Sequence, residues 1–167
     1  CLNFALNYPY GCTEQLSSNL LPWLLHERLA AYDVSMRQKT AAEVREVVQN
    51  TLAVLLSRQQ PDGGLRYWDG GESCYWASAH AALVMTFAGE LGYELPSGAM
   101  ERLRAYLLRE LDNQKEKSVF TRYAVGRACH DNVIQDAALA EIAAGAAPVH
   151  GGFRSRYAGS CLKLISE

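Results

Sequence analysis

Residues 40–64, with the sequence TAAEVREVVQNTLAVLLSRQQPDGG, decide the fold that we expect for this chain. Thr40 and Glu43 form a capping-box pattern, in which each side chain accepts a hydrogen bond from the free backbone amide of the other residue. Apolar residues then recur at helical spacing, and the PDGG segment interrupts the pattern. The stretch therefore predicts a helix over about 41–58, followed by a turn.

Apolar residues recur at helical spacing on both sides of this segment as well. They predict further helices over about 13–31, 75–91, 97–111, 118–129 and 133–145. Pro22 interrupts the first of them, so we expect that helix to be kinked or split into two pieces. Strand periodicity is nearly absent. We therefore predict an all-α protein built from antiparallel helical hairpins.

The helix predicted over 75–91 has one apolar stripe, which we expect to face the core. The stripe contains Trp76, Ala79, Leu83, Phe87 and Leu91. Gly92 follows the helix as a stop signal.

Size and composition limit the classes of function. The chain has 167 residues, of which 49% are apolar, as is typical of one globular domain with a sizeable core. The net charge of −2, with basic and acidic residues mixed, gives no basic face for nucleic acid. No run of about 18 uncharged apolar residues could span a membrane. Because the start lacks the features of a signal peptide, we expect a piece excised from a longer chain.

A thiol and a carboxamide stand three residues apart at the start of the first predicted helix, in Gly11-Cys12-Thr13-Glu14-Gln15. Side chains at positions i and i+3 of a helix are neighbours. The Cys12 thiolate can therefore attack the side-chain amide carbon of Gln15, release ammonia and leave a thioester. A helix start stabilises the thiolate, and Gly11, which has no Cβ, lets the backbone turn sharply.

Several neighbours of the motif have two possible roles. Tyr8, Tyr10 and Trp23 either shield a thioester from water or simply pack in the core. Glu14 either polarises the motif or favours the helix start.

The segment Gly11–Gln15 resembles the Gly-Cys-x-Glu-Gln signature of the α2-macroglobulin and complement thioester proteins. The preceding Tyr8-Pro9-Tyr10 resembles the bacterial branch of that family. The resemblance implies a thioester between Cys12 and Gln15 that traps attacking proteases by acylating their surface lysines. It also implies a covalent inhibitor rather than an enzyme. Its partners would be target proteases and the remaining domains of a parent protein, in the periplasm or cell envelope.

The PDGG turn, followed by an aromatic pair, resembles the inter-helix turn of α/α toroids, the fold of thioester domains. The resemblance implies that residues 1–147 form part of such a toroid, followed at 148–167 by an irregular tail or the start of an incomplete helix. A complete ring of six hairpins needs roughly 250 to 300 residues. We therefore expect about half of a ring, completed by further chain or by a partner.

The chain has five cysteines at irregular spacing, without a Cys-x-x-Cys pair: Cys1, Cys12, Cys74, Cys129 and Cys161. This spacing argues against a zinc site, and we predict neither a metal nor a cofactor. With Cys12 in a thioester, the other four either pair in an oxidising compartment or remain small buried side chains.

Two other interpretations stay open. In a thiol enzyme, His80 or His130 would act as the base for Cys12. In an inert helical scaffold, the motif would never cyclise.

Complement proteins of the family use a separate histidine to redirect the acyl group to hydroxyls, and residues 65–72, where it is expected, contain none. We therefore expect amines to be the preferred targets. His26 is expected on a solvated helix face.

Overall fold

The computed structural model describes residues 11–96, 98–111, 113 and 118–143. Within these ranges the chain forms eight helices and no strand beyond isolated bridges. They are α2 (Thr13–Leu24), α3 (His26–Leu29), α4 (Val34–Arg37), α5 (Ala41–Ser57), α6 (Tyr75–Glu90), α7 (Ala99–Leu111), α8 (Val119–Cys129) and α9 (Asn132–Ala143). The predicted all-α fold is confirmed. The tail expected at 148–167 lies outside the described residues.

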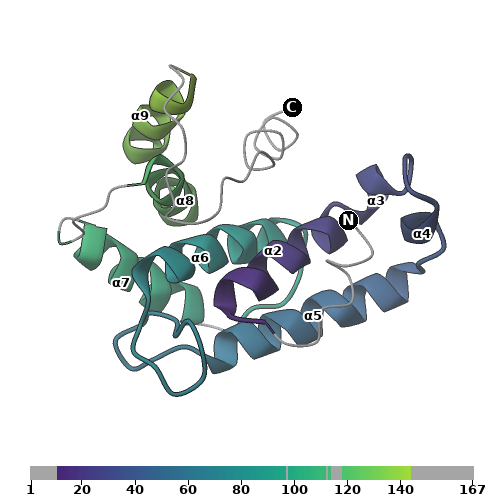
Figure 1. Cartoon of the computed structure of the whole chain (residues 1–167), viewed down its shortest axis with the longest axis horizontal. Helices are drawn as coiled ribbons and strands as arrows, with labels where there is room; N and C mark the ends of the chain where they lie inside the picture. The colour runs from purple at the N-terminus through teal and green to yellow at the C-terminus, as the bar shows by residue number, and fades with distance from the viewer. Residues whose placement is uncertain (1–10, 97, 112, 114–117, 144–167) are drawn as a thin grey trace.

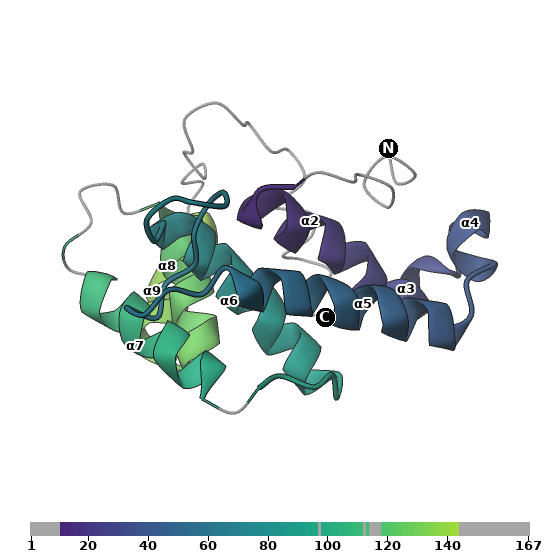
Figure 2. The ribbon, with the colours of Figure 1, turned by 90° about the horizontal axis from the view of Figure 1, so that it is seen from below.

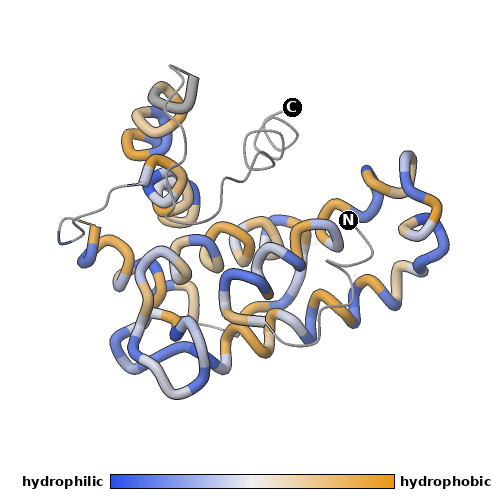
Figure 3. The backbone as a smooth tube through the Cα atoms, viewed as in Figure 1, coloured by the Kyte–Doolittle hydropathy of each residue, from blue (hydrophilic) through white to orange (hydrophobic). Residues whose placement is uncertain are grey.

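The start of α5 has the capping box that its sequence predicts. The Glu43 amide donates to Thr40 Oγ1 at 3.2 Å, and the Thr40 amide donates to Glu43 Oε2 at 2.8 Å. The buried residues of α5 are Val44, Val48, Leu52 and Leu55. Figure 3 shows apolar and polar turns alternating along this helix, as expected when one face packs on the core.

The first predicted helix is split, as Pro22 suggests, although the break comes later. α2 continues through Pro22 to Leu24, and α3 begins at His26. The break is at Leu25, whose backbone leaves the helical region with φ −93° and ψ 14°. Proline has no backbone N–H, so α2 lacks one helical hydrogen bond in its second half.

The short helix α4 has no counterpart among the predicted helices. Asp33 caps it by accepting bonds from the amides of Ser35 and Met36 at 2.8 and 3.2 Å. His26 Nε2 lies 2.8 Å from the carbonyl oxygen of Met36 and donates to it. The prediction of a solvated His26 is therefore wrong, because α4 folds back onto α3 and partly covers the ring.

α6 is the central helix and contacts α2, α7 and α8. α2 also contacts α5, while α8 and α9 pair near one end of the molecule and α3 and α4 lie at the other (Figures 1 and 2). Residues on every side of α6 are buried, from Ala77 through Ala88 with partial exposure of His80. The three central residues of the predicted stripe, Ala79, Leu83 and Phe87, are buried. Its two ends, Trp76 and Leu91, are exposed.

The loop between α5 and α6 is tied to α7 and to the start of α6. Gly63 has φ +96°, and a Cβ there would lie 2.3 Å from the carbonyl oxygen of Arg102 in α7. Leu65 is fully buried, and its amide donates to Ser78 Oγ of α6 at 2.8 Å. These contacts return the loop toward the start of α2, where the motif lies. No helix in the described ranges is long and apolar enough to cross a membrane.

Candidate functional site

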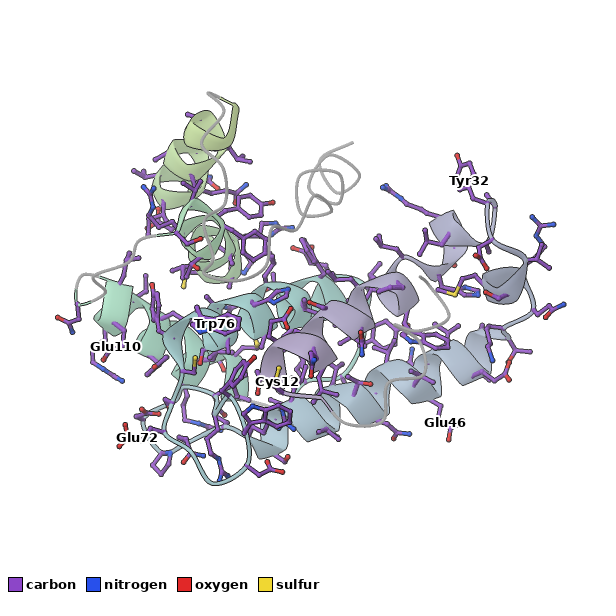
Figure 4. The ribbon with its side chains drawn as sticks, in the orientation of Figure 1. Cys12, Tyr32, Glu46, Glu72, Trp76 and Glu110 are labelled. Atoms are coloured by element: carbon purple, nitrogen blue, oxygen red, sulfur yellow. The ribbon has the colours of Figure 1, made fainter. Side chains whose placement is uncertain are left out.

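The thiol of Cys12 and the carboxamide of Gln15 meet at the start of α2. Cys12 is labelled in Figure 4. Cys12 is the residue that caps this helix and is 1% exposed. The Gln15 amide donates to Cys12 Sγ at 3.4 Å, and the Cys12 amide donates to Gln15 Oε1 at 3.2 Å. The pair forms a capping box with a thiol in place of the usual hydroxyl. The two reactive side chains are thus held at one helix end.

Gly11 packs closely against Leu16 in the first turn of α2. A Cβ at Gly11 would lie 3.0 Å from Leu16 Cγ and 3.2 Å from Leu16 Cδ2. The side chain of Leu16 occupies space that a larger residue would need, so packing favours glycine here. The sharp turn predicted at Gly11 stays a prediction.

Arg58, at the end of α5, anchors the residues on both sides of Cys12. Its Nη2 donates to the Gly11 carbonyl oxygen at 2.8 Å, and its Nη1 donates to Thr13 Oγ1 at 3.2 Å. The guanidinium is buried, whereas its ion-pair partner Asp69, 3.6 Å away, is exposed. The anchoring bonds are therefore shielded from water and the ion pair is not.

The loop between α5 and α6 brings Tyr67 next to the motif. The Thr13 amide donates to the Tyr67 carbonyl oxygen at 2.9 Å, and Thr13 Oγ1 donates to the Arg66 carbonyl oxygen. The neighbouring Cys12 side chain and partial burial raise the pKa of Tyr67 to about 12. The phenol therefore stays protonated at neutral pH.

Aromatic rings from two elements surround Tyr67. Its ring lies 5.2 Å from the ring of Trp76 at the start of α6, and 5.9 Å from the ring of Trp68, edge to face. Trp68 and Trp76 are 51% and 36% exposed. This aromatic group, Tyr67, Trp68 and Trp76, lies beside the motif and partly faces solvent.

Of the three predicted shielding residues, Tyr8, Tyr10 and Trp23, the structure describes only Trp23. Trp23 is buried in the core, and it lies about 16 Å along α2 from Cys12 at the usual helical rise. The structure therefore favours ordinary packing for Trp23. Tyr8 and Tyr10 lie outside the described residues. Glu14 accepts a hydrogen bond from Ser18 Oγ at 2.7 Å and stands in the first turn of α2, where a negative charge favours the helix start.

The candidate histidines contact other side chains. His80 in α6 packs edge-on against the Phe120 ring, with 5.5 Å between ring centroids. His130 ends α8 with a left-handed backbone, and its Nε2 lies 3.2 Å from Arg104 Nη2. Neither contact brings an imidazole to Cys12, so these contacts give the thiol-enzyme interpretation no support.

The other cysteines in the described ranges, Cys74 and Cys129, are free and half-buried. Burial raises the pKa of both thiols, to about 11 for Cys129. Among the residues that the structure describes, no three His, Cys, Asp or Glu side chains gather closely enough to hold a metal ion. An open pocket between the loop and α7 is lined by Gln60, Pro61, Asp62, Glu72, Ser73, Tyr106 and Glu110.

Comparison with known proteins gives the site a family context. The α2-macroglobulin of Escherichia coli (strain K12) is 33% identical over 113 residues, which are 67% of this chain and 7% of that protein. The chain is α2-macroglobulin-like. The α2-macroglobulin of Rickettsia conorii is 29% identical over 150 residues, 84% of this chain and 8% of that protein. No protein-family model matches the chain.

Solved structures of α2-macroglobulin extend the likeness to the fold. Native E. coli α2-macroglobulin, from domain MG7 to the C-terminus, superposes with a TM-score of 0.64 at 24% identity, over 83% of this chain and 29% of that one. The trypsin-activated E. coli protein superposes with a TM-score of 0.60 at 28% identity, over 95% of this chain and 12% of that one. The described helices are consistent with an all-α domain of the toroid type.

Proposed function

We propose that Cys12 and Gln15 form an internal thioester, and that this chain is the thioester-bearing part of an inhibitor that traps proteases. The observation that carries the proposal is the reciprocal bonding of these two residues, at 3.4 and 3.2 Å, at the start of α2. The α2-macroglobulin relatives support the same class of protein. Because the chain spans less than a tenth of the length of these two relatives, inhibition by the whole protein is part of the proposal.

The chemistry follows from the two side chains. The Cys12 thiolate attacks Gln15 Cδ, the Cδ–N bond breaks, and ammonia leaves. Burial of Cys12 excludes water, which protects the acyl bond from hydrolysis until a stronger nucleophile arrives. A lysine amine of an attacking protease then takes the acyl group, and Cys12 leaves as a thiolate. The reaction occurs once and leaves a covalent conjugate.

The wider setting is part of the same proposal. Target proteases bind covalently through lysine, other domains of a parent protein supply the bait for cleavage, and residues 1–147 form a partial thioester domain. The location inferred from the resemblance is the periplasm or cell envelope. No histidine is needed for transfer to amines, because an unprotonated amine attacks a thioester directly.

Intact mass of the full-length protein, measured before and after methylamine, tests the proposal. The native mass should be lower than the calculated mass by one ammonia, and methylamine should add a methylamide at Gln15 while freeing Cys12 for iodoacetamide. Gln15→Glu should abolish both changes, while the neighbouring Glu14→Gln should retain them. A native mass without the ammonia loss, with Cys12 already free, contradicts the proposal and favours the inert-scaffold interpretation.

Incubation with trypsin then tests the inhibitor itself. We expect a covalent conjugate that resists reduction and is absent with Gln15→Glu. A conjugate that persists in Gln15→Glu and is lost in Cys12→Ser would instead indicate that Cys12 acts without Gln15, as in a thiol enzyme.

A further inference from the structure

Cys12 lies between two residues that are bonded to the same arginine. Arg58 Nη2 donates to the carbonyl oxygen of Gly11 at 2.8 Å, and Arg58 Nη1 donates to the hydroxyl of Thr13 at 3.2 Å. These bonds join the start of α2 to the end of α5, which packs against it (Figure 2). Arg58 is 7% exposed and Thr13 is fully buried, so water does not weaken the bonds. The peptide group before Cys12 and the side chain after it are therefore fixed to α5.

Thr13 is also held from its other side. Its hydroxyl donates to the carbonyl oxygen of Arg66, and its amide donates to that of Tyr67 at 2.9 Å. The Arg66 amide in turn donates to the carbonyl oxygen of Arg58 at 3.2 Å. The three residues of this closed set of hydrogen bonds, Arg58, Thr13 and Arg66, are called the anchor below. The Thr13 hydroxyl is its central link, because it accepts from one member and donates to another.

The helix brings the thiol and the carboxamide together but does not fix their exact geometry. Gln15 lies within α2, whereas Cys12 is its N-cap and has an extended backbone, with φ −63° and ψ 169°. The direction of the Cys12 side chain therefore depends on the residues on both sides of it rather than on helical geometry. Reacting atoms must be correctly oriented, and a misplacement of about 1 Å can slow a reaction about 100-fold. The anchor holds the residues on which this geometry depends.

We propose that Arg58 is a positioning residue for closure of the thioester ring. Its bonds to the residues before and after Cys12 hold the sulfur against the Gln15 carboxamide. The inference rests on the proposed function, since it concerns the same thioester. It adds a residue from the end of α5, which the Gly11–Gln15 motif does not contain.

Ring closure balances without a further reactant. Cys12 Sγ gives up its proton and bonds to Gln15 Cδ, the Cδ–Nε2 bond breaks, and the nitrogen takes the proton and leaves as ammonia. Arg58 exchanges neither protons nor electrons and only orients the reacting atoms. Cleavage by an external amine differs, because the amine attacks Cδ and the sulfur only has to leave. Loss of the anchor should therefore slow closure much more than cleavage.

The test removes the central link of the anchor in the full-length protein, with Thr13→Val and Thr13→Ser as a matched pair. Valine has the shape of threonine but can neither accept nor donate at this position, whereas serine can do both. Closure is followed by the loss of ammonia in intact mass. It is measured in protein purified at intervals after synthesis is arrested, and in purified protein that has been opened with ammonia and then freed of it.

Thr13→Val should slow closure about 10-fold or more, and Thr13→Ser should restore it to within about threefold of the wild type. Arg58→Lys keeps the charge but loses the fork of two nitrogens, so it should also close slowly. A Thr13→Val protein that keeps its helical circular dichroism and never closes would support the proposal in its strongest form. Closure of Thr13→Val at the wild-type rate would overturn it.

Gly126→Ala controls for a general loss of stability. Its Cβ would lie 2.6 Å from the Gln135 amide nitrogen, so the variant strains the contact between α8 and α9 and keeps the anchor. It should close at the wild-type rate. Closure slowed as much in Gly126→Ala as in Thr13→Val would show that stability rather than positioning sets the rate, and would overturn the proposal.

Cleavage by methylamine separates positioning from shielding, and it is measured on the fraction of each protein that has closed. Thr13→Val should be cleaved within about threefold of the wild-type rate, because the amine does not need the sulfur in place. Cleavage accelerated as much as closure is slowed would overturn the proposal, since the anchor would then only exclude water and amines. A wild type without the ammonia loss would contradict the proposed function itself, and this inference with it.

Discussion

Arg58 Nη2 donates to the carbonyl oxygen of Gly11 at 2.8 Å, a buried contact between residues 47 positions apart. The same guanidinium donates to Thr13 Oγ1, so one side chain at the end of α5 holds the residues on both sides of Cys12. The motif is therefore attached to the protein by two elements, the end of α5 and the loop that follows it.

Replacing Arg58 with methionine should lower the free energy of unfolding by about 2 kcal/mol, because two buried acceptors lose their donor. Asp69→Asn is the control, since its carboxylate is 87% exposed and should contribute less than about 1 kcal/mol. Urea unfolding measures both changes. Equal losses in the two variants would mean that the ion pair, and not the anchoring of Gly11 and Thr13, is what stabilises this end of α5.

Gly63→Ala should be strongly destabilising, by about 3 kcal/mol or more, because it combines a positive φ with a clash against the Arg102 carbonyl oxygen. Gly70→Ala has a similar φ of +89° but open space around the Cβ, so it should cost about 1 to 2 kcal/mol. Thermal and urea unfolding of the two variants compare them. If the two variants lose the same unfolding free energy, then the close approach of the loop to α7 does not affect stability.

A second glycine pair tests the packing of α8 on α9. In Gly126→Ala the new Cβ would lie 2.6 Å from the Gln135 amide nitrogen, and we expect a loss of about 2 kcal/mol from the forced shift of backbone. Gly89→Ala in α6 meets only Leu95 Cδ1, at 3.6 Å, and should stabilise the protein by about 0.5 to 1 kcal/mol. Opposite signs in unfolding experiments are the expected result. A neutral Gly126→Ala would contradict a tight α8–α9 contact.

Acid should weaken the start of α5. The backbone amide and the hydroxyl of Thr40 hold the pKa of Glu43 below its usual range. A lowered folded-state pKa stabilises the protein above the unfolded value of 4.5, and this contribution is lost as the pH falls through the folded-state pKa. The difference in unfolding free energy between pH 7 and pH 3 should therefore be smaller in Glu43→Gln than in the wild type.

Glu46→Gln, on an exposed part of the same helix, is the control for the loss of one charge. It should keep the wild-type pH dependence. The same dependence in Glu43→Gln would show that the capping bonds do not stabilise the charged carboxylate.

Local patterns predicted much of the fold. The capping box of Thr40 and Glu43, the proline and glycines after α5, and Gly92 after α6 mark helix ends correctly, because each acts on backbone groups a few residues away. α4 was not predicted, because four residues are too few for a periodic apolar pattern.

Long-range contacts at the site had no comparable signal. Tyr67 belongs to an aromatic pair that is visible in the sequence, yet nothing in its neighbours relates it to Cys12. Arg58 is an ordinary arginine at the end of an amphipathic helix. Trp23 shows the opposite case, because an aromatic residue close to the motif in sequence packs away from it along α2.

The sequence by itself determined the longer helices and the pairing of Cys12 with Gln15, since a spacing of three residues places both side chains on one helical turn whatever surrounds them. Only the tertiary structure decided which groups meet that pair. Arg58 and Tyr67 reach it because α5 packs against α2 and the following loop bonds to Thr13. Contacts of this kind depend on how whole helices pack, and packing depends on the combined shape and burial of many side chains rather than on any short pattern.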